Sequence, residues 1–213
     1  MADNYIERKM EDLRAGKLNV GSAARPFGKG KNYVSFPMPQ RRVLIIEGSS
    51  QPARTIAGYF VKAGCKVAIL DQDSETGTFM AKNEGIRLIP VSADIHSSII
   101  ISFENLYAAW QGVDIVVSSS EYAHRCAEIW RKFKEKSPIL SDFRGRLIIL
   151  SNIIKPSLSD LSGYLKGLNI SVNQILCPLK EFSYKVAADA AIFLSLPETH
   201  LINNSVINLT EPE

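Results

Sequence analysis

The sequence has only three cysteines and no apolar run that approaches the ~20 residues of a membrane-spanning helix. Cys65, Cys126 and Cys177 are an odd, widely spaced set that fits neither a metal site nor a disulfide framework, so we expect buried thiols in a reducing compartment. Residues 1–17 are too charged for a secretory signal. These absences exclude membrane-spanning and disulfide-stabilised classes, and they predict a cytoplasmic protein with no membrane partner.

Acidic residues are missing from the stretch 14–42, which holds seven Lys and Arg residues. The formal net charge of the whole chain is +3, so the rest of the chain is net negative. A basic segment of this kind can bind nucleic acid. It carries few aromatic residues and no recognition motif, however, so we interpret it as a solvated or partner-docked arm and expect no nucleic-acid partner.

The chain divides near residue 41. Residues 3–15 have a helical pattern with their apolar residues on one stripe. An isolated helix of that length is marginal in water, so it should pack on its own domain or on a neighbouring subunit. Residues 17–40 contain several Gly and Pro residues and are predicted to be irregular. We therefore predict an arm over 1–41 and one domain over 42–213.

Helix and strand patterns alternate through the domain. Apolar runs predict strands at 43–47, 66–71, 87–91, 113–118, 145–151, 170–176 and 205–209. Amphipathic patterns predict helices at 52–63, 74–84, 98–110, 121–135, 158–166 and 181–195. Such alternation, with right-handed crossovers, produces a doubly wound sheet covered on both faces. The predicted fold class is α/β: a mostly parallel, seven-stranded Rossmann-like sheet with helices on both faces, plus the N-terminal arm.

The domain is organised around Val43–Asp71, which has the pattern of a strand, a turn, a helix and a second strand that ends in an acid. Units of this kind bind dinucleotides. Their turns use glycines so that backbone N–H groups can approach a pyrophosphate. Here the turn is EGSSQPA, residues 47–53. The architecture is present, while most of the phosphate-binding chemistry is absent.

This domain resembles the short-chain dehydrogenase/reductase family in the order and spacing of its segments. Val43–Asp71 aligns without a gap on the family's first strand, glycine turn, helix and second strand. The later segments that resemble the family are SADI (92–95), DIVVSSSE (114–121), GRLIILSN (145–152) and ISVNQILCP (170–178). The resemblance implies a Rossmann-like fold and, for the family in general, carbonyl reduction or alcohol oxidation with NAD or NADP by dimers or tetramers.

The phosphate-binding positions depart from the family pattern. The three family glycines fall on Glu47, Gln51 and Ala53, and Pro52 removes one N–H donor from the helix start. At ~5 Å and an effective dielectric of ~20, Glu47 would repel one phosphate charge by roughly 3 kcal/mol, on the order of a hundredfold in affinity. We therefore expect no cofactor.

The catalytic positions depart as well. The family serine falls on Asn152, and the helix that carries the family tyrosine and lysine is cut short. Tyr164 and Lys166 lie in its remnant, but two residues apart rather than four and at the end of the helix. No residue is assigned a catalytic role.

Four positions remain as vestigial cofactor-binding candidates: Gly48, Ser50, Asp71 and Asp94, the last at the family's acidic adenine-side position. For Asp71 we favour a turn residue that caps the next helix. Asp94 and His96 could handle a proton, although a histidine after a strand is usually a loop residue.

One helix face offers a possible metal site. Glu121, His124 and Glu128 would share a face of the 121–135 helix, which is compatible with metal binding. Such residues more often form a solvated face or a subunit contact. We therefore predict no metal site.

Three functions remain. We favour a catalytically inactive relative of the short-chain dehydrogenases that acts as an interaction or scaffold subunit, either with itself or with an active relative. Its predicted interface is helix 121–135, with apolar Tyr122, Cys126, Ile129, Trp130 and Phe133. The alternative is an NAD(P)-dependent oxidoreductase with relocated catalytic residues. A further alternative is a binding module for an uncharged or cationic small ligand.

Overall fold

The computed structural model describes residues 37–38, 40–92, 94–136, 145–153, 158–177 and 181–209. The predicted N-terminal helix (3–15) and almost all of the arm lie outside these residues. The predicted boundary at residue 41 stays a prediction. Met38 is buried, and its N–H donates to the carbonyl of Ala63 at 2.7 Å, so the packed body includes residues ahead of the first strand.

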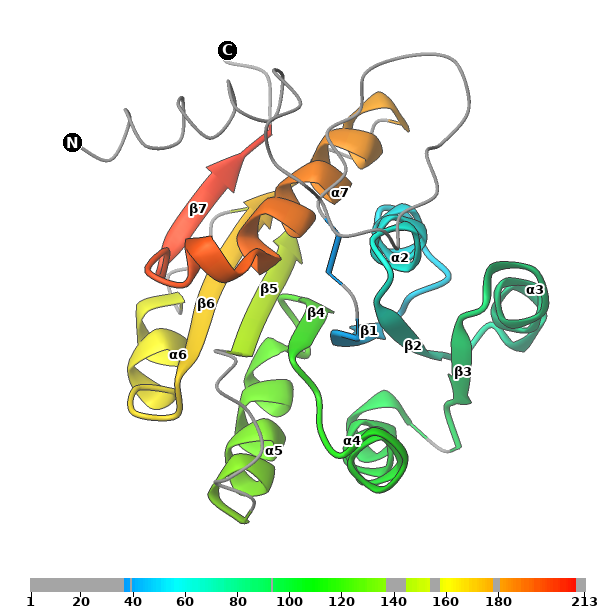
Figure 1. The fold of residues 1–213 in the computed structure, drawn as a ribbon, viewed down its shortest axis with the longest axis horizontal. Helices are drawn as coiled ribbons and strands as arrows, with labels where there is room; N and C mark the ends of the chain where they lie inside the picture. The colour runs from blue at the N-terminus through cyan, green and yellow to red at the C-terminus, as the bar shows by residue number, and fades with distance from the viewer. Residues whose placement is uncertain are drawn as a thin grey trace. The chain divides into compact units, whose positions relative to one another are not determined.

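Seven strands form one sheet in the order β3-β2-β1-β4-β5-β6-β7 (Figure 1). All six strand pairings are parallel. The strands are β1 (Arg42–Ile46), β2 (Lys66–Asp71), β3 (Arg87–Pro90), β4 (Ile115–Ser119), β5 (Gly145–Ser151), β6 (Ile170–Leu176) and β7 (Ser205–Asn208). The predicted fold class and the seven predicted strands are confirmed.

Six α-helices connect the strands, and they alternate with them as predicted. They are α2 (Ala53–Lys62), α3 (Ser74–Glu84), α4 (Ile95–Trp110), α5 (Ala123–Lys136), α6 (Leu158–Tyr164) and α7 (Glu181–Ser195), and a short 3₁₀ helix, η1 (Pro197–Thr199), follows α7. Helix α4 begins three residues earlier than predicted because the Asp94 carboxylate accepts the N–H of Ser97 at 2.9 Å and caps it. None of the helices in the described part of the chain is both long and apolar enough to span a bilayer.

The helices cover both faces of the sheet. Helices α2, α3 and α7 lie on one face, and α4, α5 and α6 lie on the other (Figure 1). Helix α7 packs directly on α2, so the two helices lie on the same face of the sheet. Helix α2 connects β1 to β2, in the direction of the β3 edge, whereas α7 connects β6 to β7 at the opposite edge. In a parallel sheet, this arrangement gives α7 the opposite hand to the other five crossovers. The expectation of right-handed crossovers is therefore wrong for α7. This helix covers the face of the sheet beside α2, and α5 and α6 cover the other face (Figure 1).

The apolar side chains of α5 lie in the core. Tyr122, Cys126, Ile129 and Trp130 are buried against the sheet and α4, and Phe133 is partly buried against Phe103 and Tyr107. The outward face of α5 is polar and charged instead, with His124, Glu128, Lys132 and Glu135 exposed. The apolar surface on which the predicted α5 interface depended is thus used inside the domain.

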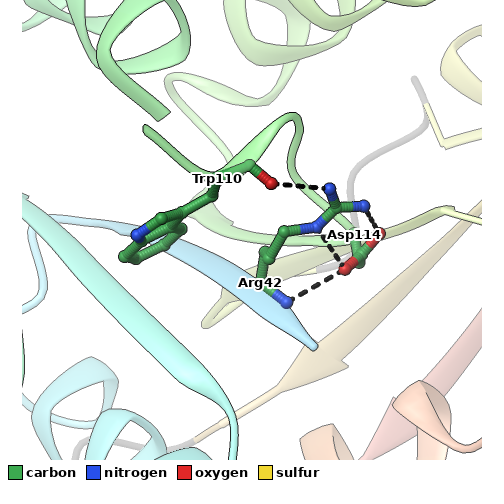
Figure 2. Close-up of polar contacts among 3 residues, drawn as sticks. All are labelled: Arg42, Trp110 and Asp114. Atoms are coloured by element: carbon green, nitrogen blue, oxygen red, sulfur yellow. Dashed lines mark hydrogen bonds and ion pairs between the residues drawn. The ribbon is translucent and has the colours of Figure 1, made fainter. Parts of the chain in front are cut away.

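An ion pair locks the amino ends of the two central strands. The Arg42 guanidinium at the start of β1 donates through Nε to Asp114 Oδ2 at 2.8 Å and through Nη2 to Asp114 Oδ1, just before β4 (Figure 2). It also donates to the carbonyl of Trp110 at the end of α4, at 2.9 Å. Hydrogen bonding to the Asp114 carboxylate raises the pKa of Arg42. The pair therefore joins β1, β4 and α4 at one point.

Candidate functional site

The candidate site lies at the carboxyl ends of β1, β2 and β4. The chain leaves β1 through α2 on one face of the sheet, and it enters β4 from α4 on the other face. Ligands of open α/β sheets bind where the strand order reverses in this way. The turn of residues 47–53, which the sequence marked as a damaged phosphate site, follows β1 at this point.

Glu47 adopts a backbone conformation that favours glycine. Its φ is +56°, in the left-handed region, and its N–H donates to the carbonyl of Leu70 at 2.8 Å. This is the position where the resemblance places the first family glycine. The turn has thus kept a glycine-like backbone while it carries a carboxylate.

The other turn residues close the turn on itself. The backbone N–H and the hydroxyl of Ser50 both donate to the carbonyl of Glu47, at 3.3 and 2.9 Å. Gly48 is buried, and a Cβ on it would lie 2.4 Å from Cγ2 of Ile69. Gly48 is therefore required by the packing of the turn on β2.

The carboxylate of Asp71 is hydrogen-bonded to this turn. Its side chain is buried at the end of β2, and its carboxylate accepts the N–H of Ser49 at 2.7 Å and that of Asp73 at 2.8 Å. The sequence interpretation of Asp71 as a residue that caps the next helix does not describe this contact, because the side chain that caps α3 is Asp73. A turn amide that could face a phosphate is thus already bonded to a carboxylate of the chain.

The start of α2 offers few free donors. Pro52 occupies the N-cap without a side-chain cap, and it has no N–H. The N–H of Arg54 donates to the carbonyl of Ser50 at 2.8 Å. The Gln51 amide oxygen accepts a hydrogen bond from the Thr55 hydroxyl at 2.7 Å. This bond holds the Gln51 side chain over the helix start. The geometry leaves little room for the anion contacts typical of this position.

Glu47 lies close enough to Glu121 and Asp71 for their charges to act on its carboxyl. Burial raises the pKa of Glu47, and the charges of Glu121 and Asp71 raise it further. Burial also raises the pKa of Tyr122, with smaller contributions from Glu47 and Glu121. The negative charges of Glu121 and Asp71 disfavour ionisation of Glu47, and the same charges make this edge of the sheet repulsive to anions.

Glu121 is the member of this group that sequence reasoning missed, because it was weighed only as a helix-face residue. Glu47 and Glu121 follow the ends of the neighbouring strands β1 and β4, and that placement was the available signal. The proposed set of Glu121, His124 and Glu128 is not brought together: within the described ranges no group of three or more His, Cys, Asp or Glu residues is placed to hold a metal ion.

Asp94 and His96 are close enough for His96 to act on the Asp94 carboxyl, but each side chain also has a contact of its own. Hydrogen bonding to Ser97 lowers the pKa of the Asp94 carboxyl, which is exposed and caps α4. The ring of His96 lies edge-on to that of Tyr122, with centroids 5.2 Å apart. This contact brings His96 to the margin of the carboxylate group, while Asp94 acts as a helix cap.

Asn152, at the family's serine position, and Tyr164, in the remnant of the shortened helix, lie at opposite edges of the sheet. Asn152 is exposed just after β5, at the carboxyl edge. Tyr164 ends α6 and precedes β6, at the amino edge, where its carbonyl accepts Nη1 of Arg131 at 2.9 Å and its ring lies 4.8 Å from that guanidinium. A seven-residue strand separates the two edges by roughly 20 Å. Neither Tyr164 nor Lys166 can act on a group bound beside Asn152.

Comparison with known proteins gives a consistent fold. No protein-family model and no curated protein sequence matches this chain. Among solved structures, a hydroxysteroid dehydrogenase from Escherichia coli superposes with a TM-score of 0.68 and 14% identity, over 82% of this chain and 97% of that one. A short chain dehydrogenase from Bacillus anthracis gives 0.67 and 15%, over 79% and 94%.

A third structure, RhlG of Pseudomonas aeruginosa in an active-site complex with NADP, gives a TM-score of 0.63 and 17% identity, over 82% of this chain and 96% of that one. These identities are too low to transfer an activity, but the overlap covers nearly the whole of each of the three solved chains. The described domain therefore has the fold of the short-chain dehydrogenases.

Proposed function

We propose that this chain is a non-catalytic protein with a short-chain dehydrogenase fold that acts by association. The observation that carries the proposal is the hydrogen bond from the Ser49 N–H to the Asp71 carboxylate, inside a turn flanked by Glu47 and Glu121. A dinucleotide diphosphate would have to displace one carboxylate and approach two others. Because Glu47 is partly buried, that repulsion is screened less than it would be in bulk water.

The competing function is an NAD(P)-dependent oxidoreductase, and the similarity to solved dehydrogenases favours it. Such chemistry requires an acid–base group within hydrogen-bond reach of the reacting carbonyl. The separation of Tyr164 from Asn152 across the sheet weighs against it.

The surface that best supports association is the β7 edge of the sheet. The opposite edge strand, β3, contains Arg87 and Pro90, and both residue types block edge-to-edge pairing. Strand β7 has the sequence SVIN, with no charge and no proline. An edge strand that lacks charge and proline can pair with an identical edge across a two-fold axis. The proposed partner is therefore a second copy of this chain.

Exposed apolar side chains gather along the same end of the chain. Leu201 is 78% exposed in the loop before β7, and Val206 is 38% exposed on β7 itself. On α7, Val186 and Phe193 are 42% and 41% exposed, two turns apart on one face. The proposal thus moves self-association from α5 to the β7 edge.

Sedimentation velocity of the full chain tests this proposal. We expect a dimer that Val206→Lys weakens at least tenfold, because a lysine on the edge strand opposes pairing. Ile101→Lys is the matched control, since Ile101 is 41% exposed on α4, outside the proposed interface, and should leave the dimer intact. A monodisperse monomer at high protein concentration, or equal weakening by both variants, would contradict the proposal.

A further inference from the structure

Two buried polar side chains contact the segment that connects α7 to β7. Arg146, the second residue of β5, and Asn173, in β6, are each only 1% exposed. A polar group that leaves water loses its hydration, so it is tolerated in the interior where protein acceptors and donors replace the lost water. The partners of these two side chains therefore indicate which part of the chain they hold in place.

The Arg146 guanidinium holds the carboxyl-terminal end of α7. Its Nε donates to the carbonyl of Leu194 at 3.0 Å, and its Nη2 donates to that of Leu196 at 3.2 Å. Nη1 donates to the carbonyl of the neighbouring Gly145 at 3.2 Å. The last carbonyls of a helix have no partner within the helix, and a cation at that end is also favoured by the helix dipole. Arg146 thus ties the end of α7 to β5.

The Asn173 amide holds the start of β7. Its nitrogen donates to the carbonyl of Ile202 at 3.0 Å, and its oxygen accepts the N–H of Ser205 at 3.1 Å. Ser205 is the first residue of β7 and lies opposite Asn173 in the register of β7 on β6. Because one amide group can donate and accept at once, a single side chain fixes both the loop and the beginning of the strand.

Further hydrogen bonds close the connection between these two points. The Thr199 hydroxyl donates to the carbonyl of Leu196 at 2.9 Å, and the N–H of Ile202 donates to the carbonyl of Thr199 at 2.9 Å. The N–H of Asn204 donates to the carbonyl of Val172 in β6 at 2.7 Å. With its backbone bonded to β6 and to itself, the connection is a fixed element of the domain.

This fixed connection presents the exposed apolar side chains of the proposed association surface. Phe193 and Val206 each lie next to a residue that one of the buried side chains holds, and Leu201 lies between them in the connection. Groups that are already held in one geometry lose less conformational entropy when a partner binds them. The relative position of α7 and β7 should therefore affect the affinity of the association.

The geometry points to Arg146 and Asn173 as the positioning residues of the self-association surface, which hold α7 and β7 in the arrangement that a second copy of the chain binds. This inference rests on the proposed function, because it concerns the same surface. Both side chains are buried inside the protomer and do not touch the partner. Their loss should weaken the dimer by displacing Phe193, Leu201 and Val206, and not by removing a contact with the partner.

Sedimentation velocity of full-length variants tests the assignment. Asn173→Ala removes the amide, and Arg146→Lys keeps the charge but loses the fork that reaches two carbonyls. We expect each variant to weaken the dimer about tenfold, since side chains that are no longer held must be ordered on binding. The measurement is made at a temperature at which circular dichroism shows every variant to be folded.

The matched control is Gly48→Ala. A Cβ at Gly48 would clash with Ile69, so this variant is destabilised, but its turn follows β1 and lies outside the β7 edge. It should dimerise like the wild type. Equal weakening by Gly48→Ala and by the two other variants would overturn the positioning role, because the effect would then follow stability alone.

The remaining outcomes separate this inference from the proposed function. If Asn173→Ala and Arg146→Lys dimerise with wild-type affinity while Val206→Lys weakens the dimer, the positioning role is overturned and the association stands. A wild-type chain that is monomeric overturns both.

A measurement on the wild type requires no variant to fold. In heteronuclear NOE experiments on the ¹⁵N-labelled chain, the amides of Leu201 and Asn203 should be as rigid as those of β6. Values typical of a mobile loop would overturn the positioning role.

Discussion

The two edges of this sheet differ in the arrangement of their charged side chains: opposite charges pair at one edge, and like charges lie together at the other. At the amino edge, Arg42 and Asp114 form a largely buried pair in which every contact joins opposite charges or a donor to an acceptor. At the carboxyl edge, Glu47, Asp71 and Glu121 gather with like charge. The comparison teaches that one edge is built for stability. At the carboxyl edge, where ligands of this fold class bind, the like charges repel one another, and the packing of the surrounding residues offsets that repulsion.

The largest expected effect comes from breaking the amino-edge pair. Asp114→Asn leaves the Arg42 guanidinium without its counter-charge, and uncompensated charges at such sites are costly. We expect the free energy of unfolding to fall by about 3 kcal/mol. Urea denaturation followed by circular dichroism measures the change.

The matched control is Glu135→Gln, which removes the carboxylate of an exposed pair with Arg131 on α5. Exposed helix pairs contribute about 0.3–0.5 kcal/mol, so this variant should be close to the wild type. Equal losses for the two variants would mean that the buried pair is no more important than a surface pair, and the contrast between the edges would fail.

The turn at the carboxyl edge gives the next effect. Gly48→Ala forces a Cβ to 2.4 Å from Ile69 Cγ2, and the overpacking should lower the free energy of unfolding by about 1–3 kcal/mol. Gly58→Ala is the control, since a Cβ there meets nothing within 4 Å in helix α2, and it should raise stability by about 0.5–1 kcal/mol. A neutral Gly48→Ala variant would show that the turn yields easily.

The smallest effect concerns the like charges. Since the folded-state pKa of Glu47 is raised, ionisation of this residue opposes folding. The penalty is absent below the unfolded pKa of about 4.3, develops as pH rises through the folded value and is complete at neutral pH. Glu47→Gln should therefore stabilise the protein by about 0.5 kcal/mol at pH 7, given its partial exposure, and have no such effect near pH 4. A gain that grows in acid would contradict the carboxylate cluster.

Most of the fold could be predicted from the sequence, because an apolar run marks a strand and an apolar stripe marks a helix within a short segment of the chain. The strands from Val43 to Val206 lie where alternation placed them. The predicted start of α4 was three residues too late, because the apolar stripe does not include the first three residues of the helix, which follow the cap Asp94. The hand of α7 depends on which face the other helices fill, which no local pattern records.

The site was less accessible to sequence reasoning. Glu47 was placed correctly in the turn, but the partner of the turn amide, Asp71, comes from the next strand, and that contact depends on the register of β1 on β2. The apolar stripe of α5 was recognised, but a stripe does not say whether it faces the sheet or a partner. Arg146 and Asn173 belong to no motif, so only their burial and their contacts single them out.

The central claim is that the carboxyl-edge turn does not hold a dinucleotide diphosphate. Fluorescence titration of NADPH and of NADH with the full chain tests it most directly, with an active short-chain dehydrogenase as the positive control. The account predicts no saturable enhancement at micromolar concentrations, because Asp71 holds the Ser49 amide and Glu47 and Glu121 repel the phosphates. Saturable micromolar binding of either nucleotide to the wild-type chain would contradict it.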